Sequence, residues 1–171
     1  IDPVLRTKGY DDITKLKWET PAPVEPTGPK GRRKKGSGRT DYLLCVKVGT
    51  MPKPLPVAVL EAKKEDEDPL KGMQQAKKYS ECQRFEVKYV FASNGHLYGE
   101  HDHFTKMQSG TFPLADFITH ADLTARYAKD SGINLGTAEA KMLFMPDSPP
   151  WNKYRYYQDA AIRAAFEKII L

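Results

Sequence analysis

The stretch Pro56-Val-Ala-Val-Leu-Glu61-Ala62-Lys63-Lys64 decides how the chain folds. It begins with an apolar run, and a run of this length predicts a strand that is buried on both faces of a sheet. Side chains alternate along a strand, so Glu61 and Lys63 are expected on one face and Ala62 on the other. A buried strand that ends with two opposite charges on one face predicts a polar site at that edge of the sheet.

The surroundings of this Glu-x-Lys sequence separate it from the two others, at 86–88 and 139–141. An isolated pair of this kind is most often a solvated charge pair. Here a second strand-like segment comes first and carries Asp41 near its start. A helical segment follows and carries Gln75 and Tyr79, which are four residues apart and therefore share a helix face. The context favours a catalytic role for the first pair.

Composition limits the classes of protein that the chain can belong to. Its 171 residues, with 40% hydrophobic and 29% charged residues, suffice for one globular domain and a fragment of a second. No apolar run approaches the length of a membrane span, so no membrane partner is expected, and the N-terminus shows no signal-peptide pattern. Cys45 and Cys82 lack metal-ligand spacing and fit a reducing, cytoplasmic setting best. The net charge of +5 leans modestly toward polyanionic partners.

A segment of different composition, 21–38, precedes Asp41. It contains four prolines, four glycines and a cluster of basic residues, among them Arg32, Arg33, Lys34 and Lys35. Such a segment cannot pack a core, so we expect a mobile loop. Two interpretations stay open for its basic residues: an arm that contacts phosphates beside the site, or the solvated tip of a loop.

The remaining elements follow from local patterns. Turn and periodicity signals predict a helix that ends at Gly9, an antiparallel pair of strands, and a hairpin that turns at Asn94-Gly95. A proline preceded by acidic residues predicts the start of the helix that carries Gln75. The expected strands are 41–48, 57–62, 86–93 and 96–100, and the expected helices after residue 10 are 69–82 and 117–130, with a further helical stripe in 154–171.

The candidate residues suit the hydrolysis of a phosphodiester. This reaction needs neutralised phosphate charge and an activated water, and a bound Mg²⁺ can supply both. Mg²⁺ prefers oxygen ligands. Asp41 and Glu61 would supply carboxylates from neighbouring strands, and the backbone carbonyl of Ala62 could add a third oxygen.

Three further side chains complete the expected catalytic set. Lys63 would orient the water or stabilise the developing charge. Gln75 and Tyr79 would contact the phosphate or brace the lysine from the helix. None of these groups reads bases, so the site should cut with little sequence preference.

These motifs resemble the PD-(D/E)xK nuclease core, in the version found at the N-terminus of the motor (R) subunit of type I restriction enzymes. The matching residues are Asp41, Glu61-Ala62-Lys63 and Gln75-x-x-x-Tyr79. The resemblance implies an α/β fold, a central mixed β-sheet flanked by helices. Further matching stretches lie in the expected order along the chain: Ile1-Asp-Pro-Val-Leu with Gly9-Tyr10, Gly38-Arg-Thr-Asp41-Tyr-Leu-Leu, and Phe91-Ala-Ser-Asn-Gly95.

A final match concerns the end of the chain. Arg155-Tyr-Tyr-Gln158 is similar to the glutamine motif that opens superfamily-two helicase motors, in which the glutamine contacts the adenine of ATP. The resemblance implies an endonuclease domain over 1–143, a linker over 144–153 and the first helix of a truncated motor over 154–171. No Gly-x-x-x-x-Gly-Lys-Ser/Thr loop occurs, so this chain alone is not expected to hydrolyse ATP.

By resemblance, the chain is the Mg²⁺-dependent endonuclease domain of a type I site-specific deoxyribonuclease. The full subunit would join methylation and specificity subunits, translocate double-stranded DNA with ATP, and cut it away from the recognition site. Two alternatives remain: a stand-alone modification-dependent or repair nuclease, and a catalytically silent nuclease fold that binds DNA or supports assembly. The motif at Gln158 argues against the first alternative, and the intact site residues argue against the second.

Overall fold

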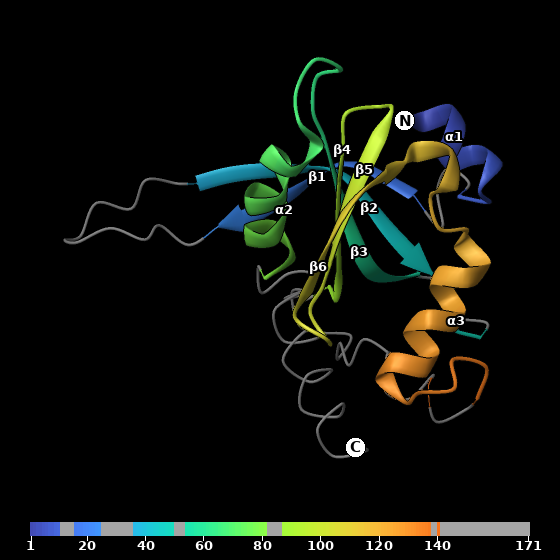
Figure 1. Ribbon diagram of the computed structural model, residues 1–171. Coiled ribbons are helices and arrows are strands. Elements are labelled where there is room, and N and C mark those ends of the chain that lie inside the picture. Colours follow the sequence, from blue (N-terminus) through green and yellow to red (C-terminus); the bar gives the residue numbers. More distant parts are fainter. Residues whose placement is uncertain (11–15, 25–35, 50–53, 82–86, 138–139, 141–171) are drawn as a thin grey trace, which may run out of the picture.

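The computed structural model describes residues 1–10, 16–24, 36–49, 54–81, 87–137 and 140, and for 16–24 and 36–39 the backbone alone. The described elements are ordered along the chain as in Figure 1, where η marks a 3₁₀ helix. They are α1 (Asp2–Thr7), β1 (Leu16–Val24), β2 (Gly36–Val46), β3 (Leu55–Ala62), η1 (Pro69–Gly72), α2 (Met73–Ser80), β4 (Tyr89–Ser93), β5 (Leu97–Asp102), β6 (Met107–Pro113), η2 (Leu114–Asp116) and α3 (His120–Ser131).

The strands form one six-stranded mixed sheet in the order β1-β2-β3-β4-β5-β6. Among the described strands, only β3 and β4 pair in parallel, because the chain crosses over through η1 and α2 between them. The other neighbours are antiparallel, including the expected pair of β2 and β3. The helix α2 covers one face of the sheet, while α1 and α3 lie on the other (Figure 1). The expected α/β class with a central mixed sheet is confirmed.

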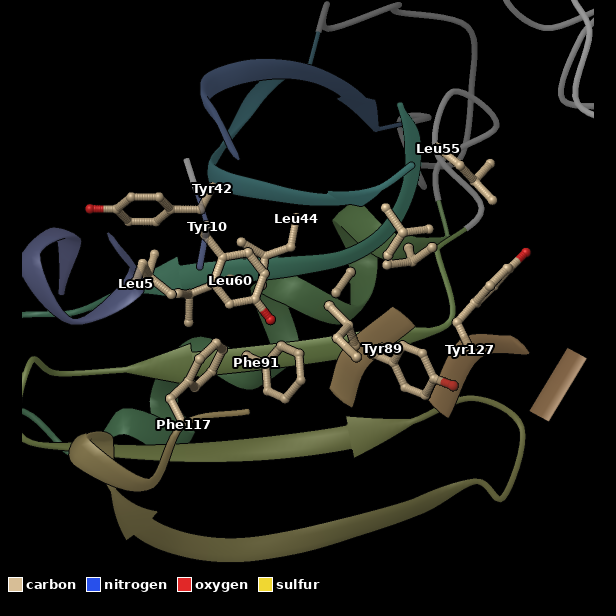
Figure 2. Packing of buried hydrophobic residues seen from close by; sticks show 14 of the residues in the cluster. Leu5, Tyr10, Tyr42, Leu44, Leu55, Leu60, Tyr89, Phe91, Phe117 and Tyr127 are labelled. Atoms are coloured by element: carbon tan, nitrogen blue, oxygen red, sulfur yellow. The ribbon is translucent and has the colours of Figure 1, made fainter. Parts of the chain in front are cut away.

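Two hydrophobic cores lie on the two faces of the sheet. The larger core joins aromatic and aliphatic side chains of β2, β3 and β4 to α1, η2 and α3, and Figure 2 shows Phe91 and Phe117 within it. The smaller core packs alternate residues of the same strands, such as Leu43 and Val59, against α2. The strand β3 is buried along most of its length, as its apolar run predicts. The sheet is therefore packed on both faces, and it holds in place the side chains that project from its α2 side.

The helix termini follow the predicted local signals. Helix α1 ends before Gly9, whose φ of 85° belongs to the left-handed region that favours glycine. The expected helix 69–82 is divided into η1 and α2, and the Asp68 carboxylate caps η1 by accepting the Leu70 N–H at 2.9 Å. Helix α3 begins at His120, rather than at the expected residue 117, because the Thr119 side chain caps it.

The structure corrects the expected loop over 21–38. Strand β1 continues through residues 21–24, and β2 already begins at Gly36. The two strands pair along their length, and the described pairing ends with Val24 opposite Gly36. This β1–β2 arm extends beyond α2 (Figure 1). Composition misled the prediction because prolines and glycines are disfavoured in strands but tolerated at a sheet edge such as β1.

Strand β6 was not predicted. Its sequence, MQSGTFP, shows no alternation of apolar and polar residues, and most of the strand is exposed. An edge strand that is exposed on both faces has no buried face to impose a period of two. The expected linker 144–153 and motor helix 154–171 lie outside the described residues and stay predictions.

Candidate active site

The two carboxylates of the candidate site stand on the face of the sheet that α2 covers. In β2, Asp41 lies two residues before Leu43, and in β3, Glu61 lies two residues after Val59. Both of these apolar residues belong to the core under α2. Because side chains two residues apart on a strand point to the same face, Asp41 and Glu61 also point to the α2 side. The antiparallel register of the two strands then brings Asp41 and Glu61 next to each other.

Asp41 is held by the end of the neighbouring strand. Its Oδ2 accepts a hydrogen bond from the backbone N–H of Ala62 at 2.8 Å. The next amide, that of Lys63, donates to the Ser93 carbonyl of β4 at 2.7 Å. The end of β3 is therefore anchored on both sides, which fixes the backbone from which the candidate residues project.

The two oxygens of the buried Glu61 carboxylate differ in their hydrogen bonding. The residue is 4% exposed. Its Oε1 accepts a hydrogen bond from Lys63 Nζ at 3.2 Å, and its Oε2 is buried with no hydrogen-bond partner among the described residues. The expected placement of both side chains on one face is thereby confirmed. Burial, and then the nearby charge of Asp41, raise the pKa of Glu61 to about 7, against the opposing influence of Lys63 and Gln75.

A chain of hydrogen bonds extends from Glu61 to α2. Lys63 Nζ also donates to Gln75 Oε1 at 3.1 Å, and Gln75 Nε2 donates to the Tyr79 hydroxyl at 2.9 Å. The last two side chains lie one helical turn apart on α2 and are partly or fully buried. The structure therefore joins four of the expected catalytic side chains by hydrogen bonds and places the fifth, that of Asp41, beside Glu61.

The cluster fits a divalent cation by the chemistry of its donors. Two neighbouring carboxylates repel each other, and an orphaned buried oxygen such as Glu61 Oε2 is costly without a partner. A cation between them would relieve both penalties. Within the described part of the chain, no group of three or more His, Cys, Asp and Glu side chains is arranged to hold a metal. Mg²⁺ binds proteins through one or two carboxylates and keeps several waters, so the two carboxylates present match its ordinary ligand set.

The expected DNA-contacting and ATP-contacting residues are not part of this cluster. Arg32, Arg33, Lys34 and Lys35 lie in the segment that joins β1 to β2, outside the described residues. Gln158 is likewise outside them. Both expectations stay predictions.

Sequence reasoning overlooked the small residues around Lys63. Gly72, at the end of η1, lies against the lysine stem, and Ala92 of β4 lies close to Gly72. Their small size is the only sequence signal, and it gains a meaning once the packing is known.

No helix in the described ranges is long and apolar enough to cross a membrane.

The fold and the site define the chain as an α/β protein whose central sheet presents two carboxylates and a lysine beside a flanking helix. Among solved structures, the chain is similar to a fragment of a protein assigned as an HsdR subunit of a type I restriction enzyme from Vibrio vulnificus YJ016. The TM-score is 0.68 and the sequence identity 29%; the match covers 98% of this chain but 30% of the other. No protein-family model matches the sequence, and no curated protein matches it. The likeness shows a fold related to restriction enzymes.

Proposed function

We propose that the chain is the Mg²⁺-dependent endonuclease domain of a type I restriction enzyme R subunit, which hydrolyses phosphodiesters of double-stranded DNA. The observation that carries the proposal is the state of Glu61. Its carboxylate is buried beside Asp41, one oxygen is bonded to Lys63, and the other oxygen has no partner among the described residues. The likeness to the HsdR fragment supports the assignment to this enzyme class.

Each residue of the cluster has a distinct role in this proposal. Asp41, Glu61 and the Ala62 carbonyl would hold Mg²⁺, which when bound supplies Lewis acidity at the phosphate and an activated water. Lys63 would hold that water in position or stabilise the charge that develops on the phosphate. Gln75 and Tyr79 brace the lysine, because Gln75 accepts from its ammonium and donates to the tyrosine hydroxyl.

The whole subunit would add what this chain lacks. Further domains would supply ATP-driven translocation, with Gln158 contacting the adenine, and methylation and specificity subunits would supply the recognition of a DNA sequence. The basic residues 32–35, in the segment that joins β1 to β2, would contact the DNA backbone. Support for this setting comes from the solved neighbour, of which this chain matches about a third.

The test combines metal binding with cleavage, since a nuclease domain controlled by a motor can be silent alone. Titration calorimetry with Mg²⁺ would compare the chain with its Glu61→Gln variant. The matched control is Glu65→Gln, whose exposed carboxylate lies in the loop just beyond β3. We expect the wild type and the control to bind Mg²⁺ and the Glu61→Gln variant to bind it much more weakly. Cleavage of a supercoiled plasmid should follow the same order.

Two results would contradict the proposal. Equal Mg²⁺ affinity of the wild type and Glu61→Gln would show that the cation is not bound at this carboxylate. Plasmid cleavage by Glu61→Gln at the wild-type rate, in purified protein, would place the nuclease activity elsewhere.

A further inference from the structure

The backbone of Gly72 does not require glycine. This residue ends η1 and precedes α2, with φ −74° and ψ −20°. These angles lie in the right-handed helical region, which every residue adopts readily. Gly72 is the N-cap residue of α2, a position that accepts glycine, but no side chain caps the helix there. A specific reason for glycine lies in its surroundings.

The surroundings of Gly72 leave no room for a side chain. A Cβ atom at this position would lie 2.9 Å from Cε and 3.2 Å from Cγ of Lys63, and 3.3 Å from Cβ of Ala92. The Lys63 stem therefore passes directly beneath η1 on its way to Glu61 and Gln75. A methyl group at position 72 would occupy that path.

The 3₁₀ helix cannot easily lift away to make room. Leu70 packs against Gly99 of β5 so closely that a Cβ at residue 99 would collide with the leucine side chain. Asp68 caps η1 at its start. Ala92 belongs to the buried strand β4 and is fixed as well. The flexible lysine is thus the group that would move.

We infer that Gly72 is a positioning residue, which keeps open the path by which the Lys63 ammonium reaches Glu61 and Gln75. The inference rests on the proposed function for its catalytic meaning. Its physical content, the placement of the lysine, can be measured without any nuclease activity. Replacing Gly72 by alanine should displace Lys63 while leaving the fold intact, because the closest contact, at 2.9 Å, falls on Cε near the end of a flexible side chain.

The first measurement is the rate at which Lys63 reacts with an acetylating reagent, followed by peptide mass spectrometry on the metal-free chain. In the wild type the ammonium is held by two hydrogen bonds and its side chain is 20% exposed. We expect Gly72→Ala to react about tenfold faster at Lys63, the factor that the loss of a hydrogen bond between charged groups implies. Other lysines, such as Lys129 on α3, should react unchanged.

The matched control is Gly110→Ala, at a glycine in β6 where an added Cβ meets no atom within 4 Å. It should leave the reactivity of Lys63 at the wild-type value. Thermal unfolding should show that Gly72→Ala is folded and unfolds in one cooperative transition. An unchanged Lys63 reactivity in a folded Gly72→Ala variant would overturn the inference.

DNA cleavage supplies the second measurement and separates the two proposals. Gly72→Ala should lower kcat about 100-fold, the scale for losing a positioned charge, with KM for DNA unchanged. In a Lys63→Met background, the same substitution should have no further effect. If Lys63 becomes reactive in Gly72→Ala but the wild type never cleaves DNA or binds Mg²⁺, the positioning role stands and the proposed function fails.

Discussion

Replacing Glu61 by glutamine should make the metal-free protein more stable at alkaline pH. The glutamic acid is 4% exposed, and its pKa in the folded state is raised to about 7 from an ordinary 4.5. The folded state therefore binds this proton more tightly than the unfolded state does. Stability is lost as the pH rises from about 4.5 to about 7, and the loss is complete above that window.

The magnitude follows from the same pKa values. A difference of about 2.5 between the folded and unfolded pKa corresponds to roughly 3 kcal/mol of unfolding free energy. Glutamine carries no charge at any of these pH values, so the Glu61→Gln variant lacks this loss. The gain at pH 8 should be somewhat smaller than 3 kcal/mol, because Lys63 loses its charged partner.

Urea unfolding in EDTA at pH 4.5 and pH 8 measures this effect. We expect nearly equal stabilities at pH 4.5 and a more stable variant at pH 8. Added Mg²⁺ at about 100 times its Kd should restore about 2.7 kcal/mol to the wild type only. Parallel pH profiles for the two proteins would refute the reasoning, since they would show that Glu61 ionises in the folded state as it does in water.

Three other perturbations give separate outcomes. Lys63→Met should lower plasmid cleavage by about 10² to 10³, yet calorimetry should still detect Mg²⁺ binding because the lysine is no ligand. Arg126→Met should lower the free energy of unfolding, measured by urea denaturation, by about 2 kcal/mol. The substitution removes the guanidinium that pairs with Asp102 at 2.9 Å and lies over the Tyr89 ring. An unchanged free energy of unfolding would contradict this expectation. Changing residues 32–35 to glutamine should weaken the salt dependence of DNA affinity, measured by fluorescence anisotropy. The slope of log K against log salt concentration should fall in magnitude by about 0.9 for each phosphate that the segment no longer neutralises. An identical slope would show that this segment is a solvated loop tip.

Predictions succeeded where the signal was local. The apolar run before Glu61 predicted β3, and its alternation placed Glu61 and Lys63 on one face, because both depend on neighbours in the sequence. The Asn94-Gly95 turn predicted the hairpin of β4 and β5 for the same reason. Predictions failed where no local period exists. The exposed edge strand β6 and the proline-containing end of β1 are held by pairing with a neighbouring strand, which leaves little trace in their own sequences.

The sequence by itself determined most of the central strands and helices, the chemical types at the site and the side of the strand on which Glu61 stands. Only the tertiary structure decided that Asp41 meets Glu61, because their proximity depends on the register between two strands. It also decided the raised pKa of Glu61 and the need for Gly72, because burial and free space arise from segments that are distant in the chain. A pattern reports which way a side chain points, whereas its charge state and the room around it depend on what the rest of the fold packs against it.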